Sequence, residues 1–308
     1  MKRLEKFLRP YRRESILAPL FKLLEVVFDL MVPVVVAQII DVGVAKNDRG
    51  YIVEMFFVLL LMAAVGLLCS FTAQFFAAKA SVGFATSVRQ AMFDHIQGLS
   101  FTELDTLGTD TLITRLTDDV NQVQNGINMG LRLLLRSPFV VIGAMVMAFT
   151  INVRCALIFV VTVPVLFVVV FSIMLISIPL FKKVQAGLDR VTGLTRENLT
   201  GVRVIRAFCR EEQSVADFEK SNDELTCLNE FVGKISALLN PLTYVLINIA
   251  AVVLIWQAGL QVNIGSMQQG QVVALYNYML QIIVELIKLA SLIITLNKSV
   301  ACAERVSG

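Results

Sequence analysis

Six long apolar stretches alternate with more polar segments along the 308-residue chain. A run of about 18 apolar residues or more is typical of a helix that crosses a membrane. One such run, Ala156–Leu180, contains no charged residue. The pattern predicts that residues 1–308 form one all-α membrane domain with six transmembrane helices. Their approximate apolar cores are residues 16–40, 52–78, 133–151, 155–180, 235–260 and 272–296.

Composition supports this class of protein. Hydrophobic residues make up 56% of the chain and charged residues 17%, against about 25% charged residues in an average soluble domain. The five cysteines are scattered and the single histidine, His95, stands alone, so neither a disulfide framework nor a metal site is expected. No catalytic residue is predicted. Basic residues are not interleaved with aromatic ones, so nucleic acid is not an expected partner.

Lysine and arginine indicate the orientation in the membrane. Residues 1–14 carry six of them, residues 79–137 carry five and residues 181–235 carry nine. The three short loops carry only Lys46, Arg49 and Arg154. Because positive residues concentrate on the cytoplasmic side, both termini and both long connections are predicted to be cytoplasmic, in a multi-pass protein of the plasma membrane.

The two long connections between spans have a helical pattern. Residues 80–98 contain no proline and continue directly from the second span. About 20 further helical residues would extend about 30 Å beyond the bilayer. The sequence therefore predicts two helical extensions that leave the membrane, turn at short elements near residues 100–110 and 197–212, and return.

The second turning element has two chemically different faces. On a helix, Arg203, Arg206 and Arg210 lie on one side. Val204, Ile205 and Phe208 lie on the other. Either this element packs only on its neighbours, or it is a docking element for a cytoplasmic partner.

Charged residues inside the first span are candidates for function. Lys22, Glu25 and Asp29 recur at spacings of three and four, which places them on one helical face. They form either an internal set of ion pairs that fixes helix packing or a polar wall of a substrate cavity. The surplus of one negative charge, together with Glu285, suggests attraction of a cationic substrate.

Polar stripes also mark the fifth and sixth spans. In the sixth span the stripe consists of Asn277, Gln281, Glu285 and Lys288, followed by Ser291 and Thr295. In the fifth span it consists of Asn240, Tyr244 and Asn248. These residues either line a water-filled cavity or form hydrogen bonds between helices.

Several motifs resemble one known family. They are "LSFTELDTLGTDTLITRLTDDVNQVQ" (99–124), "ENLTGVRVIRAFCRE" (197–211) and "LQIIVELIKLASLIITLNKSVACAERV" (280–306). In this order and spacing, they resemble the transmembrane domain of a type I ABC exporter, the type IV transporter fold. The N-terminal "LAPLFKLLEVVFDLMVP" is most similar to one half of the bacterial heterodimeric multidrug exporters.

The resemblance implies a division of labour between this chain and its partners. With a second transmembrane domain, in a heterodimer rather than a homodimer, it would form an alternating-access pathway for amphipathic drugs or lipids in the bacterial cytoplasmic membrane. Coupling helices near 100–107 and 200–208 would dock on ATPase domains that bind ATP and Mg. The residues carried over to this role are Phe101, Thr102, Leu104, Arg203, Ile205, Arg206 and Phe208.

Two features depart from the pattern of a complete transporter of this family. The sequence contains no Walker A motif, G-x-x-x-x-G-K-S/T, so this chain is not expected to be an ATPase or to bind a cofactor. Glu285 occupies a place where the family often has proline, which affects the expected shape of the sixth span. The alternatives are a secondary transporter or channel without an ATPase, and an accessory membrane subunit; broken spans with paired glycine or proline interruptions would favour the former.

Overall fold

A computed structural model describes residues 2–307, which are helical nearly throughout and contain no strand. Six continuous helical stretches in this part of the chain are long and apolar enough to cross a membrane. The all-α class with six spans is therefore confirmed. The helices are α1 (Lys2–Leu8), α2 (Arg12–Gln38), α3 (Arg49–Gln97), α4 (Phe101–Leu107), α5 (Thr109–Thr114), α6 (Val120–Leu133), α7 (Arg136–Ile151), α8 (Val153–Ala207), α9 (Glu211–Ala237), α10 (Leu239–Asn263) and α11 (Gln269–Ser307).

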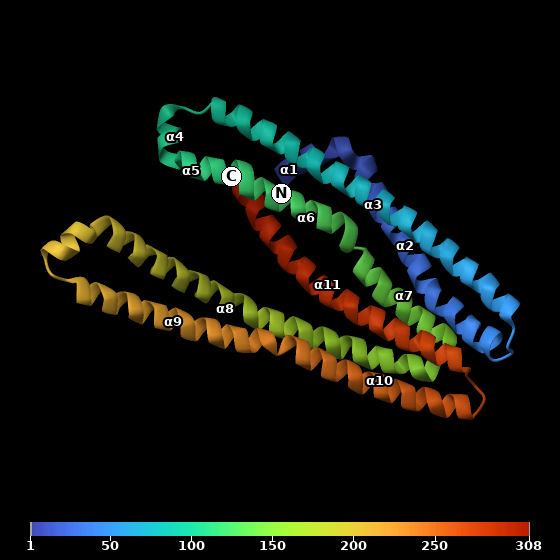
Figure 1. Cartoon of the computed structure of the whole chain (residues 1–308). Helices are drawn as coiled ribbons and strands as arrows, with labels where there is room; N and C mark the ends of the chain where they lie inside the picture. Colours follow the sequence, from blue (N-terminus) through green and yellow to red (C-terminus); the bar gives the residue numbers. More distant parts are fainter. Residues whose placement is uncertain (1, 308) are drawn as a thin grey trace. The chain divides into compact units, whose positions relative to one another are not determined.

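The chain divides into two compact units. One consists of Met1–Val161 and Ala250–Gly308, and the other of Thr162–Ile249. The first contains α1 to α7, the start of α8, the end of α10 and α11 (Figure 1). The second consists mainly of the long helical hairpin made by α8 and α9.

In the first unit, small residues allow helices to approach closely. Ala73, Ala77 and Ala80 are buried along one face of α3, as is usual where membrane helices pack. At its start, α11 is tied to the end of α2 and the turn that follows it. The Gly270 amide donates to Asp41 Oδ1 over 2.6 Å, and a Cβ at Gly270 would lie 2.3 Å from the Ala37 carbonyl oxygen. Only glycine fits this contact.

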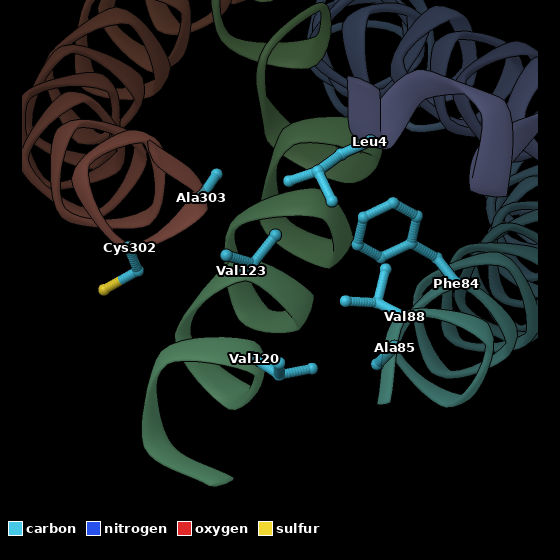
Figure 2. Packing of buried hydrophobic residues seen from close by; sticks show 8 residues of the cluster. All are labelled: Leu4, Phe84, Ala85, Val88, Val120, Val123, Cys302 and Ala303. Atoms are coloured by element: carbon cyan, nitrogen blue, oxygen red, sulfur yellow. The ribbon is translucent and has the colours of Figure 1, made fainter. Parts of the chain in front are cut away.

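An apolar cluster joins four helices beyond the predicted apolar cores of the spans. Leu4 of α1, Phe84 of α3 and Val123 of α6 point toward one another, while Ala303 comes from α11 (Figure 2). The other members of this apolar cluster are Ala85, Val88, Val120 and Cys302. At its edge, Arg305 Nε donates to Asp119 Oδ2 over 2.9 Å. The first helical extension is therefore packed firmly onto α1 and α11.

The first turning element is a separate short helix, as expected. Ser100 accepts a hydrogen bond from the Glu103 amide, and the Glu103 carboxylate accepts one from the Ser100 amide. This reciprocal cap satisfies two donors that the start of a helix leaves free. Hydrogen bonds that the Ser100 hydroxyl and amide donate to the Glu103 carboxylate lower the pKa of that carboxyl. Gly108 then adopts a φ of 76°, which glycine tolerates without strain, and the chain turns directly into α5.

The second turning element is helical but is not a separate helix. Residues 200–207 continue the hydrogen-bonded ladder of α8, although Figure 1 shows that the last turns of α8 change direction before the chain reverses into α9. Cys209 takes a φ of 52° at the reversal, and the Ser214 hydroxyl bonds to Asn198 across it. The expected direction change is present without a break in the helix.

The predicted core 235–260 also contains an interruption. α9 ends at Ala237 and α10 begins at Leu239. Pro241 has no amide hydrogen to donate to the Ala237 carbonyl, which explains why the ladder is interrupted here. All six predicted cores fall inside the continuous helical stretches, although core 133–151 also spans the short break between α6 and α7; where the bilayer begins and ends along them stays a prediction.

Candidate functional site

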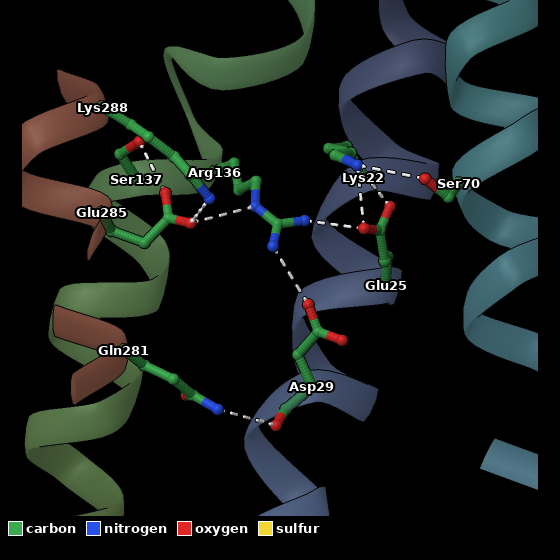
Figure 3. Close-up of polar contacts among 9 residues, drawn as sticks. All are labelled: Lys22, Glu25, Asp29, Ser70, Arg136, Ser137, Gln281, Glu285 and Lys288. Atoms are coloured by element: carbon green, nitrogen blue, oxygen red, sulfur yellow. Dashed lines mark hydrogen bonds and ion pairs between the residues drawn. The ribbon is translucent and has the colours of Figure 1, made fainter. Parts of the chain in front are cut away.

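Lys22 and Glu25 form a buried ion pair one helical turn apart on α2. Lys22 Nζ lies 2.8 Å from Glu25 Oε1 and 2.6 Å from Oε2. It also donates to Ser70 Oγ of α3 over 3.3 Å (Figure 3). The helical spacing of three residues brings the two charges together locally, so the predicted pairing of these two residues is found.

Arg136, at the start of α7, connects three carboxylates. Its Nη1 donates to Glu25 Oε1 over 2.7 Å and its Nη2 to Asp29 Oδ2 over 3.1 Å. Its Nε lies 3.5 Å from Glu285 Oε1 on α11. The planar guanidinium, with donors pointing in several directions, therefore holds α2, α7 and α11 together at one point (Figure 3).

Glu285 receives further bonds from both sides. Ser137 Oγ of α7 donates to its Oε2 over 2.9 Å, and Lys288 Nζ donates to its Oε1 over 3.0 Å. We call Lys22, Glu25, Asp29, Arg136, Glu285 and Lys288 the charged cluster. Since a charge within a membrane is costly unless it is paired, this mutual pairing is what allows six ionisable groups to gather here.

The formal charge of the cluster differs from the expected one. The spacing in the first span suggested a surplus of negative charge, reinforced by Glu285. Instead, three cations, Lys22, Arg136 and Lys288, face three anions. The expected surplus of negative charge is therefore absent from the charged cluster, because Arg136 and Lys288 balance Asp29 and Glu285; the attraction of a cationic substrate stays a prediction.

A cavity of ≈ 580 Å³ adjoins the charged cluster. Its volume falls in the range of small-molecule sites, about 300–1,000 Å³. Its polar wall consists of Asp29, Arg136, Asn277, Gln281, Glu285 and Lys288. Its apolar wall consists of Val32, Pro33, Val36, Val140, Leu280 and Val284. The structure thus brings the polar stripe of the sixth span to a cavity together with Asp29, while Lys22 and Glu25 lie outside its lining.

Pro33 adds a backbone acceptor to this wall. A proline has no amide hydrogen, so the carbonyl four residues earlier, that of Asp29, loses its helical partner. Gln281 Nε2 of α11 lies 3.5 Å from that carbonyl oxygen, at the limit of a hydrogen bond. The Gln281 Oε1 atom is buried without a hydrogen-bond partner among the described residues.

The side chains at both turning elements are exposed. Phe101 at the start of α4 is 87% exposed, and Phe208 at the end of the second element is 73% exposed. Thr102, Arg203 and Arg206 are exposed as well, whereas Leu104 and Ile205 are partly buried. On the second element the basic residues are exposed, as are Val204 and Phe208 on the apolar face.

A family model described as the ABC transporter transmembrane region matches residues 15–286. The chain belongs to this family. The match includes five of the six charged-cluster residues, all except Lys288, and it confirms the resemblance to an ABC transporter membrane domain that the sequence motifs indicated.

Similar proteins agree with this assignment. The chain is 33% identical over 304 residues to an uncharacterized ABC transporter ATP-binding protein of Mycobacterium tuberculosis, covering 99% of this chain and 52% of that protein. The chain is 31% identical over 310 residues to the ABC transporter ATP-binding protein YfiB of Bacillus subtilis, covering 99% of this chain and 53% of that protein. An ATP-dependent lipid A-core flippase of Pseudoalteromonas translucida is 24% identical over 305 residues, with coverage of 99% and 52%. The chain spans about half the length of these relatives.

Arg136 is the residue of this ABC transporter membrane domain that sequence reasoning missed. It was counted among the positive charges of a cytoplasmic connection, yet its side chain is only 15% exposed and contacts three acids. One signal was available. Arg136 is the only basic residue within the predicted apolar core 133–151, and such a residue needs a partner.

The polar residues of the fifth span do not line this cavity. Asn240, Tyr244 and Asn248 lie on the part of α10 that belongs to the second unit, and all three are exposed. Their predicted role in a cavity wall stays a prediction. Among the residues that the structure describes, no group of three or more His, Cys, Asp or Glu side chains is arranged to hold a metal ion.

Proposed function

We propose that this ABC transporter membrane domain is the membrane-spanning part of an ATP-driven exporter. It would form an alternating-access pathway with a second, homologous domain, in a heterodimer rather than a homodimer. Relatives about twice its length carry the description of ATP-binding proteins, which supports an ATPase domain as the source of energy. ATP and Mg would bind to that domain, and this chain would supply the pathway.

The cavity beside the charged cluster is the proposed contact site for the substrate. Asp29, Asn277, Gln281, Glu285 and Lys288 would provide its polar contacts. The apolar wall provides a complementary surface for an amphipathic drug or lipid, since ligand sites combine apolar walls with a few placed polar groups. Lys22 and Glu25 would support the site by holding Arg136 in place. Asn240, Tyr244 and Asn248 would extend the pathway from the fifth span.

The exposed tips of the two helical extensions would couple this chain to an ATPase by docking on it. A phenylalanine exposed at each tip, Phe101 and Phe208, is an apolar anchor of the kind that fills a pocket on a partner protein. Arg203 and Arg206 would add charge complementarity at the second tip. Thr102, Leu104 and Ile205 would support the two docking helices. Both tips and both termini would lie in the cytoplasm of a bacterial cell.

Substitution at the second tip tests this proposal. In the transporter assembled with its ATPase domains in vesicles, Phe208→Ala and Arg206→Ala should each lower transport per ATP hydrolysed, since the docking contact transmits the movement. Substrate binding should be unchanged, because the cavity is formed by other helices. Phe231→Ala is the matched control, because Phe231 is also exposed, on α9, but away from the tip.

The result that would overturn the coupling role is equally specific. If Phe208→Ala and Arg206→Ala weakened substrate binding while transport per ATP stayed the same, the tip would not be a transmission element. An equal loss in Phe231→Ala would point to general damage to the α8–α9 hairpin.

A further inference from the structure

We propose that the cavity beside the charged cluster binds an amphipathic zwitterion that carries a primary ammonium group and an acidic group. This inference rests on the proposed transport function, because it names the class of substrate for the same cavity. The basis is a division within the charged cluster. Four of its members are consumed by internal contacts, and two face the cavity with bonding capacity to spare.

Exposure separates these two groups. The side chains of Lys22, Glu25, Arg136 and Glu285 are each at most 15% exposed. Those of Asp29 and Lys288 are 44% and 45% exposed. One half-exposed anion and one half-exposed cation therefore line the same cavity, separated by the ion-paired Arg136 and Glu285 (Figure 3).

The Asp29 end is rich in hydrogen-bond acceptors. Arg136 engages Asp29 through Oδ2, and no described residue donates to Oδ1. Pro33 leaves the Asp29 carbonyl oxygen without its helical partner, so that only Gln281 Nε2, at 3.5 Å, reaches it. Acceptors that lack donors favour a ligand that brings N–H groups. A primary ammonium brings three and adds a charge opposite to that of Asp29.

The Lys288 end has the opposite chemistry. Its ammonium has three donors, and one of them is used by Glu285 over 3.0 Å. The remaining donors of this half-exposed group suit a phosphate or carboxylate. An anion at this end and a cation at the Asp29 end would each meet an opposite charge.

Ligands with a single charge fit less well. A simple cation would pair with Asp29 but would give Lys288 no anionic partner. A simple anion would pair with Lys288 but would give Asp29 no cationic partner. Unlike a single-charge ligand, a zwitterion uses both ends, so the preference comes from two contacts rather than one. Val32, Val36 and Val140 on the facing helices then provide an apolar surface for the hydrocarbon part.

The test is a head-group series that shares one alkyl chain. The head groups are phosphoethanolamine, phosphocholine, phosphate and a primary amine. Binding to the purified chain in detergent micelles is measured by native mass spectrometry. We expect the phosphoethanolamine compound to bind about tenfold more tightly than the phosphate or the amine, because it adds one charge-assisted contact. The phosphocholine compound is a zwitterion without N–H donors, so its affinity should lie between that of the phosphoethanolamine compound and those of the phosphate and the amine.

Two variants test which charged group of the ligand binds at the Asp29 end and which at the Lys288 end. Asp29→Asn should remove the advantage of phosphoethanolamine over phosphate, and Lys288→Gln should remove its advantage over the amine. Lys298→Gln is the matched control, because Lys298 lies on the same helix, is exposed and does not line the cavity. Should Asp29→Asn fail to fold, the wild-type series and Lys288→Gln still decide the question.

Equal affinity for all four compounds in the wild type would overturn the inference, as would an unchanged preference in both variants. A two-chain lipid with the phosphoethanolamine head group, compared with the single-chain compound, distinguishes a membrane lipid from a free amphiphile. Transport of singly charged compounds without zwitterion preference would defeat this inference and leave the exporter function standing. Selective binding without any ATP-dependent transport would defeat the exporter function instead.

Discussion

The charged cluster and the apolar cluster hold the same helix, α11, in opposite chemical ways. The charged cluster joins α11 to α2 and α7 through Arg136 and Glu285, within the predicted apolar cores of the spans. The apolar cluster joins α11 to α1, α3 and α6 through side chains such as Phe84 and Val123, outside those cores. The polar contact therefore lies where the surroundings are predicted to be apolar, and the apolar contact lies where they are predicted to be aqueous.

The difference follows from what surrounds each region. Lipid is as apolar as a leucine side chain, so burying apolar surface between membrane helices gains little, and polar contacts and close packing must give specificity. Large apolar residues such as Leu61, Leu68 and Phe71 accordingly remain exposed on α3. Outside the membrane, removing apolar surface from water is the main driving force. One helix thus changes its mode of packing along its length.

Removing Arg136 should have the largest effect on this comparison. Arg136→Met leaves Glu25, Asp29 and Glu285 without their shared cation. Breaking a buried ion pair typically costs about 3–5 kcal/mol of unfolding free energy. A thermal unfolding series in detergent would measure the loss as a lower Tm.

The control for this loss is Arg132→Met. Arg132 reaches Asn128 over 3.3 Å and has no ion pair with another described residue, so its removal should change the Tm little. Adding Glu285→Gln to Arg136→Met should restore part of the stability, because one uncompensated charge is removed. Equal destabilisation by Arg132→Met and Arg136→Met would contradict a special role for the charged cluster.

Truncation of Phe84 should be the next largest effect. Phe84 is 3% exposed in the apolar cluster, and replacing a buried phenylalanine by alanine costs about 3–5 kcal/mol. We expect a value near the lower limit, about 3 kcal/mol, because the adjoining cavity of ≈ 450 Å³ leaves neighbouring side chains room to relax. Phe75→Ala, at a position that is 64% exposed on the same helix, should cost much less in the same unfolding measurement. A comparable loss there would mean that α3 is stabilised by its outward face.

The ion pair at the edge of the apolar cluster should give the smallest effect and a dependence on pH. Asp119→Asn should cost about 1 kcal/mol, as for a partly exposed pair, since the Arg305 side chain is 54% exposed. The hydrogen bond from Arg305 lowers the pKa of the Asp119 carboxyl. Its stabilisation is therefore present above the pKa of an unfolded aspartate and lost as the pH falls through the lowered, folded value.

The corresponding measurement compares Tm values of the wild type and Asp119→Asn in neutral and acidic buffer. The difference should be present at neutral pH and disappear in acid. It should also shrink in high salt, because exposed charges are screened. A difference that persisted in acid would show that the Asp119→Asn substitution disturbs packing rather than only removing a charge.

Much of the fold was accessible from local sequence signals. Six apolar runs predict six spans because a membrane-crossing helix needs an unusual length of apolar residues, and Ser100 with Glu103 has the spacing of a capping box. The π-helices at Ile39–Val44 and Arg115–Asp119 were not predicted. A π-helical turn contains more residues than an α-helical turn because its hydrogen bonds join residues five apart, and the hydrophobic pattern of these short segments does not show this difference.

The candidate site was accessible only in part. Lys22 and Glu25 pair within one helix, so their spacing was enough. Arg136 meets Glu25 and Asp29 across 111 and 107 residues of chain, and such a contact depends on how helices pack. Without Arg136, the sequence indicated a surplus of negative charge, whereas the charged cluster pairs three cations with three anions. The stripe of Asn277, Gln281, Glu285 and Lys288 was found because it repeats on one helical face.

Pro33 has a mechanical consequence for the first span. The backbone hydrogen bond between residues 29 and 33 is absent, so α2 has one hydrogen bond fewer beside the cavity. Prolines are among the usual places where helices kink. Bending at this proline would change the direction of the outer part of α2 while Glu25 stayed bonded to Arg136 and Lys22 to Glu25. The first span is thus held by ion pairs before Pro33 and by the Gly270–Asp41 contact after it, and the missing backbone hydrogen bond lies between these two attachments, beside the cavity.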